Sequence, residues 1–174
     1  MNVFIRKFQR EDVGLKVTWI NNDKNNKYLH YDLPLKIDKT LEWFEKNKGN
    51  NHRRDYTIVY NNEAVGLIGL LNIDYKNMKA EYYICIGKSE YKGKGIAYEA
   101  SKLLLNIAFN ELKLNKVYLY TEIENVVAQR LFQKLGFNKE GLLIDDLIYN
   151  GKKVSRYLYG IRLLNQDKVS DGSE

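Results

Sequence analysis

The sequence predicts a mixed α/β domain, in which a mostly antiparallel sheet of seven strands contains a central parallel pair. Three observations lead to this fold class. Seven segments are rich in alternating, aromatic or β-branched residues, as strands are. Residues 79–112 change from a strand to a long helix across a glycine-containing turn, and residues 116–122 form a further strand. A strand, helix, strand unit of this kind places its two strands parallel.

The N-terminal half is expected to hold one strand, two helices and then three antiparallel strands. Glu11 and Asp12 precede a short apolar helix, which ends in a polar loop at 21–26. Pro34 keeps the following segment non-helical, and Asp38 can cap the second helix. The expected strands are 3–8, 55–60, 64–73 and 81–87, and the second helix is 39–48.

The C-terminal half continues with a helix, a strand, a helix and a hairpin. Gly136 is placed to close the second of these helices, and Asn150-Gly151 is a strong two-residue hairpin turn. The expected helices are 95–112 and one beginning at Asn125, and the expected strands are 116–122, 139–149 and 154–163. The order is therefore βααβββαβαββ. No internal repeat or linker interrupts it, so we expect one domain over 1–164 and a loose polar tail over 165–174.

The turn between the central strand and the long helix is a candidate phosphate-binding loop. Gly93 and Gly95 allow a sharp turn and a close approach of the backbone to a ligand, because neither carries a Cβ atom. The helix that follows begins with unpaired N–H groups and the positive end of its dipole. Lys92 and Lys94 add positive charge at the same place. This combination favours phosphate or pyrophosphate, although an ordinary strand-to-helix turn has a similar composition.

Two familiar phosphate loops do not fit these residues. A P-loop needs Gly-Lys-Ser/Thr, and here Lys94 is followed by Gly95. The dinucleotide fingerprint needs a small residue where this chain has Tyr98. The segment Glu90-Tyr91-Lys92-Gly93-Lys94-Gly95 instead resembles the coenzyme A loop of the GNAT N-acetyltransferase superfamily, Gln/Arg-x-x-Gly-x-Gly/Ala. Glu90 departs from that pattern, because the family normally has Gln or Arg there.

A second signature of the same family lies at the expected distance. Residues Asn125 to Phe137 resemble its Asn-x-x-Ala…Gly-Phe segment, and the order of elements matches throughout. The resemblance covers almost the whole chain. It is strongest to the branch that contains the ribosomal-protein N-terminal acetyltransferases. It implies a GNAT-like sheet with helices on both faces, and a monomer or a homodimer.

The resemblance also implies a reaction. Acetyl would pass from acetyl-coenzyme A, as co-substrate, directly to a primary amine in a ternary complex. The acceptor would be a protein N-terminus or a small amine, and an amino sugar on a nucleotide is an alternative. A reading of another class, a non-catalytic coenzyme A-binding or regulatory module, stays open because the family's usual proton donor is missing. Many members have Tyr where this chain has Phe132.

The residues expected to bind the cofactor follow from the two signatures. Backbone N–H groups of the central strand would stabilise the oxyanion, the glycine loop would hold the pyrophosphate, and Asn125 would hydrogen-bond coenzyme A. Phe132 would pack against the pantetheine arm or the core. The set is Ile84, Cys85, Ile86, Lys92, Gly93, Lys94, Gly95, Ile96, Ala97, Asn125 and Phe132.

The attacking amine must be neutral, so a base is useful. Glu81, at the start of the central strand, is the first candidate and Glu122 is the second, although either could be a surface carboxylate. The acceptor site should be built from the N-terminal segments and the last hairpin. Its candidates are His30, Tyr31, Trp43 and Arg54, together with Tyr28, Arg53 and Tyr149. Cys85 has no histidine near it in the sequence, which argues against a covalent acetyl-cysteine.

Composition excludes several other classes. The net charge of +6 is spread over scattered lysines, with no block of like charges and no recognition motif, so we expect no nucleic-acid partner. No run of eighteen apolar residues predicts a membrane span. One cysteine excludes an internal disulfide and favours the cytoplasm. The two histidines, His30 and His52, lack metal-ligand spacing, so no metal is expected.

Overall fold

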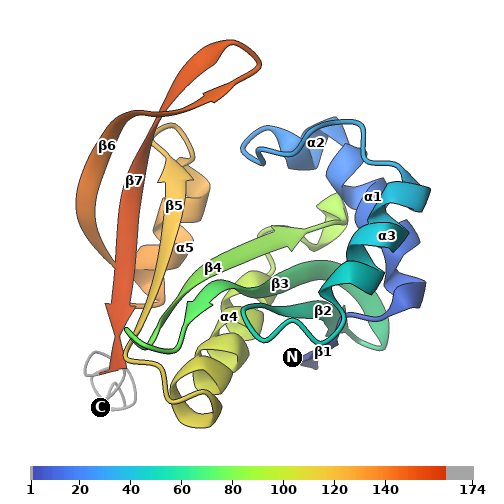
Figure 1. The fold of residues 1–174 in the computed structure, drawn as a ribbon, viewed down its shortest axis with the longest axis horizontal. Coiled ribbons are helices and arrows are strands. Elements are labelled where there is room, and N and C mark those ends of the chain that lie inside the picture. Colours follow the sequence, from blue (N-terminus) through green and yellow to red (C-terminus); the bar gives the residue numbers. More distant parts are fainter. Residues whose placement is uncertain (1, 164–174) are drawn as a thin grey trace.

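The computed structural model describes residues 2–163 of the chain (Figure 1), and the predicted tail at 165–174 lies outside the described residues. The strands are β1 (Val3–Lys7), β2 (Arg54–Tyr60), β3 (Glu63–Asp74), β4 (Lys79–Ile86), β5 (Lys116–Glu122), β6 (Asn138–Tyr149) and β7 (Lys152–Arg162). The α-helices are α1 (Val13–Asn21), α2 (Asp23–Asn26), α3 (Ile37–Asn47), α4 (Ile96–Asn106) and α5 (Val126–Lys134).

The strands form one sheet of seven in the order β1-β2-β3-β4-β5-β7-β6. Only β4 and β5 are parallel, and every other neighbouring pair is antiparallel. The predicted fold class is therefore confirmed. The single-domain boundary at residue 164 stays a prediction.

The parallel pair is short, and beyond it the two strands separate. Only Lys79, Ala80 and Glu81 of β4 pair with β5, and the last pair joins Glu81 to Tyr118. β4 then continues along β3 and β5 continues along β7, so the strands diverge as a V in Figure 1. We call this opening the fork. Along its inner edges, backbone N–H and C=O groups of β4 and β5 have no neighbouring strand to pair with. Such groups are stable only when water or a ligand supplies their hydrogen bonds.

Strand register assigns each side chain to one of two faces, because residues directly opposite each other share a face. Tyr82, Ile84 and Ile86 point to the face covered by α4 and α5, which we call the α4 face. There the ring of Tyr82 lies 5.9 Å from that of Phe132, in the main core. Glu81 points to the other face, the α1 face, which α1 and α3 cover. On β5 the alternation puts Thr121 on the α4 face.

Some boundaries differ from the predicted ones for local reasons. The predicted loop 21–26 contains the end of α1 and the short helix α2, because the Asn22 side chain accepts a hydrogen bond from the N–H of Lys24 and caps that turn. The predicted helix 95–112 is α-helical only to Asn106 and continues as one π-helical turn over Ile107–Glu111. Lys36, rather than Asp38, occupies the N-cap position of α3.

A buried lysine lies between α1, α3 and the sheet. Lys16 is 8% exposed, and its Nζ is 3.5 Å from the centre of the Trp43 ring. Arg53 stacks at 4.8 Å from the same ring and makes a two-bond ion pair with Asp55, which also accepts from the Tyr83 hydroxyl. Burial lowers the pKa of Lys16 to about 8, and the charge of Asp55 partly opposes this shift. The Trp43 ring, which attracts the ammonium, opposes it as well.

We expect Lys16→Met to stabilise the protein at neutral pH. Between pH 8 and 10.5 the unfolded chain keeps a proton that the folded chain has lost, so wild-type stability rises with pH across this window. The variant should gain about 1–3 kcal/mol in free energy of unfolding at pH 7, and its advantage should shrink by pH 10. Urea unfolding at both pH values measures the difference in free energy of unfolding. The control is Lys46→Met, at an exposed position of α3. A variant less stable than wild type at pH 7 would show that the cation–π contact outweighs burial.

Candidate active site

The glycine loop has the geometry of an anion site at the start of α4. Gly93 and Gly95 have φ angles of 75° and 80°, in the left-handed region that favours glycine. Gly95 is the N-cap of α4, so the first N–H groups of the helix have no partner within it. A Cβ atom placed on Gly93 would meet nothing within 4 Å, so the space before the loop is open. A phosphate group could therefore reach these N–H groups.

Contacts on both sides fix the loop in place. The Tyr91 hydroxyl and the Lys88 ammonium both bind the carboxylate of Glu63, at the β2–β3 turn. On the other side, Lys92 Nζ donates to Asn25 Oδ1 at 2.8 Å. The Asn25 amide in turn donates to the carbonyl oxygens of Trp19 and Gly87. Lys94 lies 5.3 Å from the Tyr91 ring. The loop is thus tied to α1, α2 and the end of β4.

The other predicted cofactor residues lie in or beside the fork. Ile84, Cys85 and Ile86 form the diverging end of β4, and Ile96 and Ala97 begin α4. Asn125 caps α5 through its side chain, which accepts from the N–H of Ala128 at 3.3 Å. Phe132 is buried among the rings of Tyr82, Phe137 and Tyr159. Opposite β4, the buried hydroxyl of Thr121 has no hydrogen-bond partner within residues 2–163.

These features fit the coenzyme A arm. The free inner edges of β4 and β5 can pair with the two amides of a pantetheine chain, as an added strand would. The glycine loop lies beyond the diverging end of β4 and can take the pyrophosphate. Among the described residues, the Thr121 hydroxyl is a buried polar group without a partner, as expected beside a polar ligand. Burial raises the pKa of the Cys85 thiol to about 11, so this cysteine stays protonated at neutral pH.

Three distant segments meet at the open end of the fork. His30 Nε2 and Glu122 Oε1 are 2.6 Å apart, and both side chains are about four-fifths buried. The His30 ring packs edge-on against Tyr149, with 5.1 Å between ring centres, and the Tyr149 hydroxyl donates to the carbonyl oxygen of Tyr31. The Tyr28 hydroxyl contacts the carbonyl oxygen of Glu124. The structure therefore brings together His30, Tyr31, Tyr149 and Glu122 from the set that the sequence predicted.

The α1 face of the fork is acidic and aromatic. Tyr118, Tyr120 and Glu122 follow one another along β5 on this face. Arg156 of β7 lies 4.4 Å from the Tyr120 ring and is paired with Asp146. Glu81 stands where the strands separate, and its carboxylate accepts from the Asn72 amide at 2.8 Å. Carboxylates and tyrosine rings in this arrangement suit a cationic amine.

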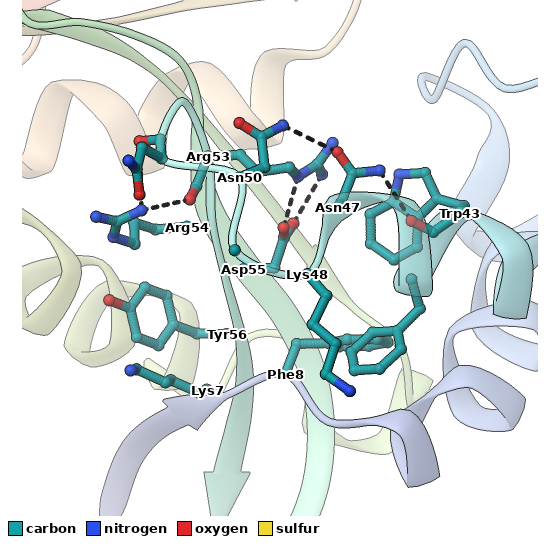
Figure 2. A pocket seen from close by; sticks show the side chains of 13 residues that line it. Lys7, Phe8, Trp43, Asn47, Lys48, Asn50, Arg53, Arg54, Asp55 and Tyr56 are labelled. Carbon is teal, nitrogen blue, oxygen red and sulfur yellow. Dashed lines mark hydrogen bonds and ion pairs between the residues drawn. The ribbon is translucent and has the colours of Figure 1, made fainter.

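Two predicted acceptor residues lie elsewhere. Trp43 and Arg54 line a cavity of about 430 Å³ between α3 and the start of β2 (Figure 2). Strand register puts Arg54 level with Leu70 and Tyr82, at the closed end of the fork and two strands away from it. Four cationic side chains line this cavity, and they would repel an amine: Lys7, Lys48, Arg53 and Arg54. The geometry does not favour the prediction that Trp43 and Arg54 bind the acceptor.

Comparison with known proteins identifies the family. Residues 2–138 match the family described as the acetyltransferase (GNAT) domain. The chain belongs to this family. It is 30% identical over 151 residues, 87% of this chain and 81% of the relative, to spermidine N(1)-acetyltransferase of Escherichia coli K12. A crystal structure of spermidine N-acetyltransferase from Vibrio cholerae with CoA and spermine superposes with a TM-score of 0.87, at 27% identity, and covers 94% of this chain and 96% of that one.

This GNAT chain is therefore an acetyl-coenzyme A-dependent N-acetyltransferase, as the coenzyme A loop predicted. The ribosomal branch is not confirmed, because a putative ribosomal N-acetyltransferase of Bacillus subtilis is 37% identical over only 54% of this chain and 51% of its own length. Within residues 2–163 no helix is long and apolar enough to cross a membrane. The same residues contain no cluster of His, Cys, Asp or Glu that could hold a metal ion.

Sequence reasoning missed two parts of the site. Asn25 links the glycine loop to α1 and β4, but its sequence neighbourhood is only a polar stretch. Thr121 sits in a strand whose alternation gives no sign that its hydroxyl lacks a partner. A single clue was available, since a threonine among the buried positions of β5 interrupts an apolar set.

Proposed function

We propose that this acetyltransferase acts on a small cationic amine of the polyamine class, such as spermidine. The carrying observation is the acidic, tyrosine-lined α1 face of the fork, which ends at Glu122. The protein as a whole is basic, with a net charge of +6, so the two carboxylates of Glu81 and Glu122 along this face are a local feature rather than a general one. The spermidine acetyltransferases named above support the same acceptor class.

The amine approaches from the α1 face while the thioester lies in the fork. Counting from the last β4–β5 pair, Cys85 and Glu122 are each four residues further on, so Glu122 is level with the predicted oxyanion donors. Glu122, paired with His30, would take the proton as the amine attacks. Glu81 lies four residues deeper, at the point of the fork, and would bind a distant ammonium of the acceptor or act through water.

This geometry supports a ternary complex better than a covalent relay through cysteine. A cysteine nucleophile has to be a thiolate. Burial raises the pKa of the Cys85 thiol to about 11, so the thiol is not ionised at neutral pH. The histidine at the fork, His30, is paired with Glu122 and not with Cys85. Direct transfer from thioester to amine therefore needs no acetyl-cysteine. The cytoplasmic location and the monomeric or dimeric state stay predictions.

An acceptor screen tests the proposal. Purified protein with acetyl-coenzyme A is assayed for release of free thiol with spermidine, with a diamine, with peptides that have free N-termini and with a nucleotide-linked amino sugar. We expect spermidine to give the highest kcat/KM, at least tenfold above any peptide. Turnover confined to peptides would instead favour the ribosomal-type acceptor, to which the Bacillus subtilis relative points.

A further inference from the structure

A buried hydroxyl beside the fork lacks a partner among the residues that the structure describes. Thr121 is 6% exposed. In the part of the chain that the structure describes, its Oγ1 is the one fully buried side-chain oxygen or nitrogen with no hydrogen bond. Leaving such a group unpaired destabilises a folded protein, and native structures rarely keep one without a reason. A ligand in the fork would supply the missing partner.

Thr121 is level with the predicted reaction centre. It lies three residues beyond Tyr118, and Ile84 lies three residues beyond Glu81, the partner of Tyr118 in the last β4–β5 pair. The backbone of Ile84 to Ile86 is where the thioester oxygen is expected. Thr121 and Glu122 are neighbours on β5 and point to opposite faces. They therefore flank the same point of the fork, with Glu122 on the acceptor side and Thr121 on the α4 side.

Two other buried hydroxyls on the α4 side already have partners. The Tyr82 hydroxyl is bonded to Ser101 Oγ at 2.6 Å, and the Tyr159 hydroxyl donates to Gln129 Oε1 at 3.1 Å. Phe132, in the same core, offers only hydrocarbon. Tyr157, which lies opposite Thr121 on β7, is only half-buried, so Thr121 carries the fully buried hydroxyl of this side that lacks a partner among the described residues.

We propose that Thr121 donates a hydrogen bond to the sulfur of coenzyme A, on the side of the thioester opposite the amine. In the transfer, the nitrogen lone pair forms the C–N bond at the carbonyl carbon, and the C–S bond breaks. Sulfur leaves with the electron pair of that bond, and the nitrogen proton passes to the Glu122–His30 pair. Thr121 keeps its own proton and stabilises the negative sulfur. This inference rests on the use of acetyl-coenzyme A in the proposed function.

The test uses Thr121→Val, which removes the hydroxyl at nearly constant shape, and Thr121→Ser, which keeps it. Each protein is titrated by calorimetry at pH 9, where free thiols are largely ionised, with coenzyme A and with desulfo-coenzyme A, which lacks the sulfur. We expect wild type and Thr121→Ser to bind coenzyme A about tenfold more tightly than desulfo-coenzyme A, the effect of a hydrogen bond to a charged group. Thr121→Val should bind the two equally.

Stability without ligand gives a second, independent readout. Because the hydroxyl has no partner in the described part of the chain, Thr121→Val should unfold at the same or a higher urea concentration than wild type. A clearly less stable variant would show that the hydroxyl is already satisfied, and would overturn the inference. If Thr121→Val lost affinity for coenzyme A and desulfo-coenzyme A equally, the inference would also be overturned, but the acetyltransferase function would not. If wild type bound neither ligand, the proposed function would fail as well.

Discussion

Replacing Glu122 by Gln is expected to lower kcat/KM for the amine by about 10²–10⁴-fold, the range of general base catalysis. The substitution keeps the size of the side chain and a contact to His30, but removes the charge that takes the proton and attracts the cation. The loss should appear in kcat as well as in KM. Affinity for acetyl-coenzyme A should be unchanged, because Glu122 faces the acceptor side of the fork. Steady-state kinetics and calorimetry measure the two effects.

Two controls sharpen this result. Glu124→Gln removes a carboxylate two residues away, where only the backbone oxygen contacts Tyr28, and should leave kcat/KM near wild type. Glu81→Gln tests the other candidate base at the point of the fork. A larger loss of kcat in Glu81→Gln than in Glu122→Gln would reverse the assignment of the base.

Replacing Gly95 by Ala is expected to weaken acetyl-coenzyme A binding by tenfold or more. Gly95 has a φ of 80°, so alanine there is strained, and its Cβ would stand at the helix terminus where the pyrophosphate is expected. Both effects move the first N–H groups of α4 away from a phosphate. Calorimetry with acetyl-coenzyme A gives the change in affinity.

Gly49→Ala is the matched control for strain. Gly49 has a φ of 79° and open space around it, but it lies in the turn after α3, far along the chain from the glycine loop. Gly49→Ala should lower the free energy of unfolding by about 1 kcal/mol, as Gly95→Ala does, and leave acetyl-coenzyme A affinity unchanged. Equal losses of affinity in the two variants would mean that Gly95 acts through stability alone.

Local features of this site were predictable from the sequence. The left-handed glycines at 93 and 95 and the starts of α4 and α5 depend on residues next to each other in the chain, and each helix begins one residue after its predicted start, which becomes its N-cap. The boundaries of β5 were predicted to the residue, because a strand that alternates buried and half-buried positions leaves a clear pattern.

Non-local features were not predictable in the same way. The fork depends on where pairing between β4 and β5 stops, and no residue pattern marks that point. The alternation of side chains along a strand shows that Arg54 and Asp55 face opposite sides of β2. It does not show which face of the sheet carries the acceptor site. The sequence places Arg54 and His30 in one expected acceptor site, but Arg54 lines a cavity at the closed end of the fork. The meeting of His30, Tyr149 and Glu122 spans over a hundred residues of chain and needs the fold.

The most direct measurement is a calorimetric titration of the wild-type protein with acetyl-coenzyme A, with NAD and ATP as controls. We expect micromolar binding of acetyl-coenzyme A at one site per chain, and at least tenfold weaker binding of the other two ligands. Equal affinity for all three would reduce the glycine loop to a general phosphate site. No binding of acetyl-coenzyme A would contradict the assignment of the fork as its site.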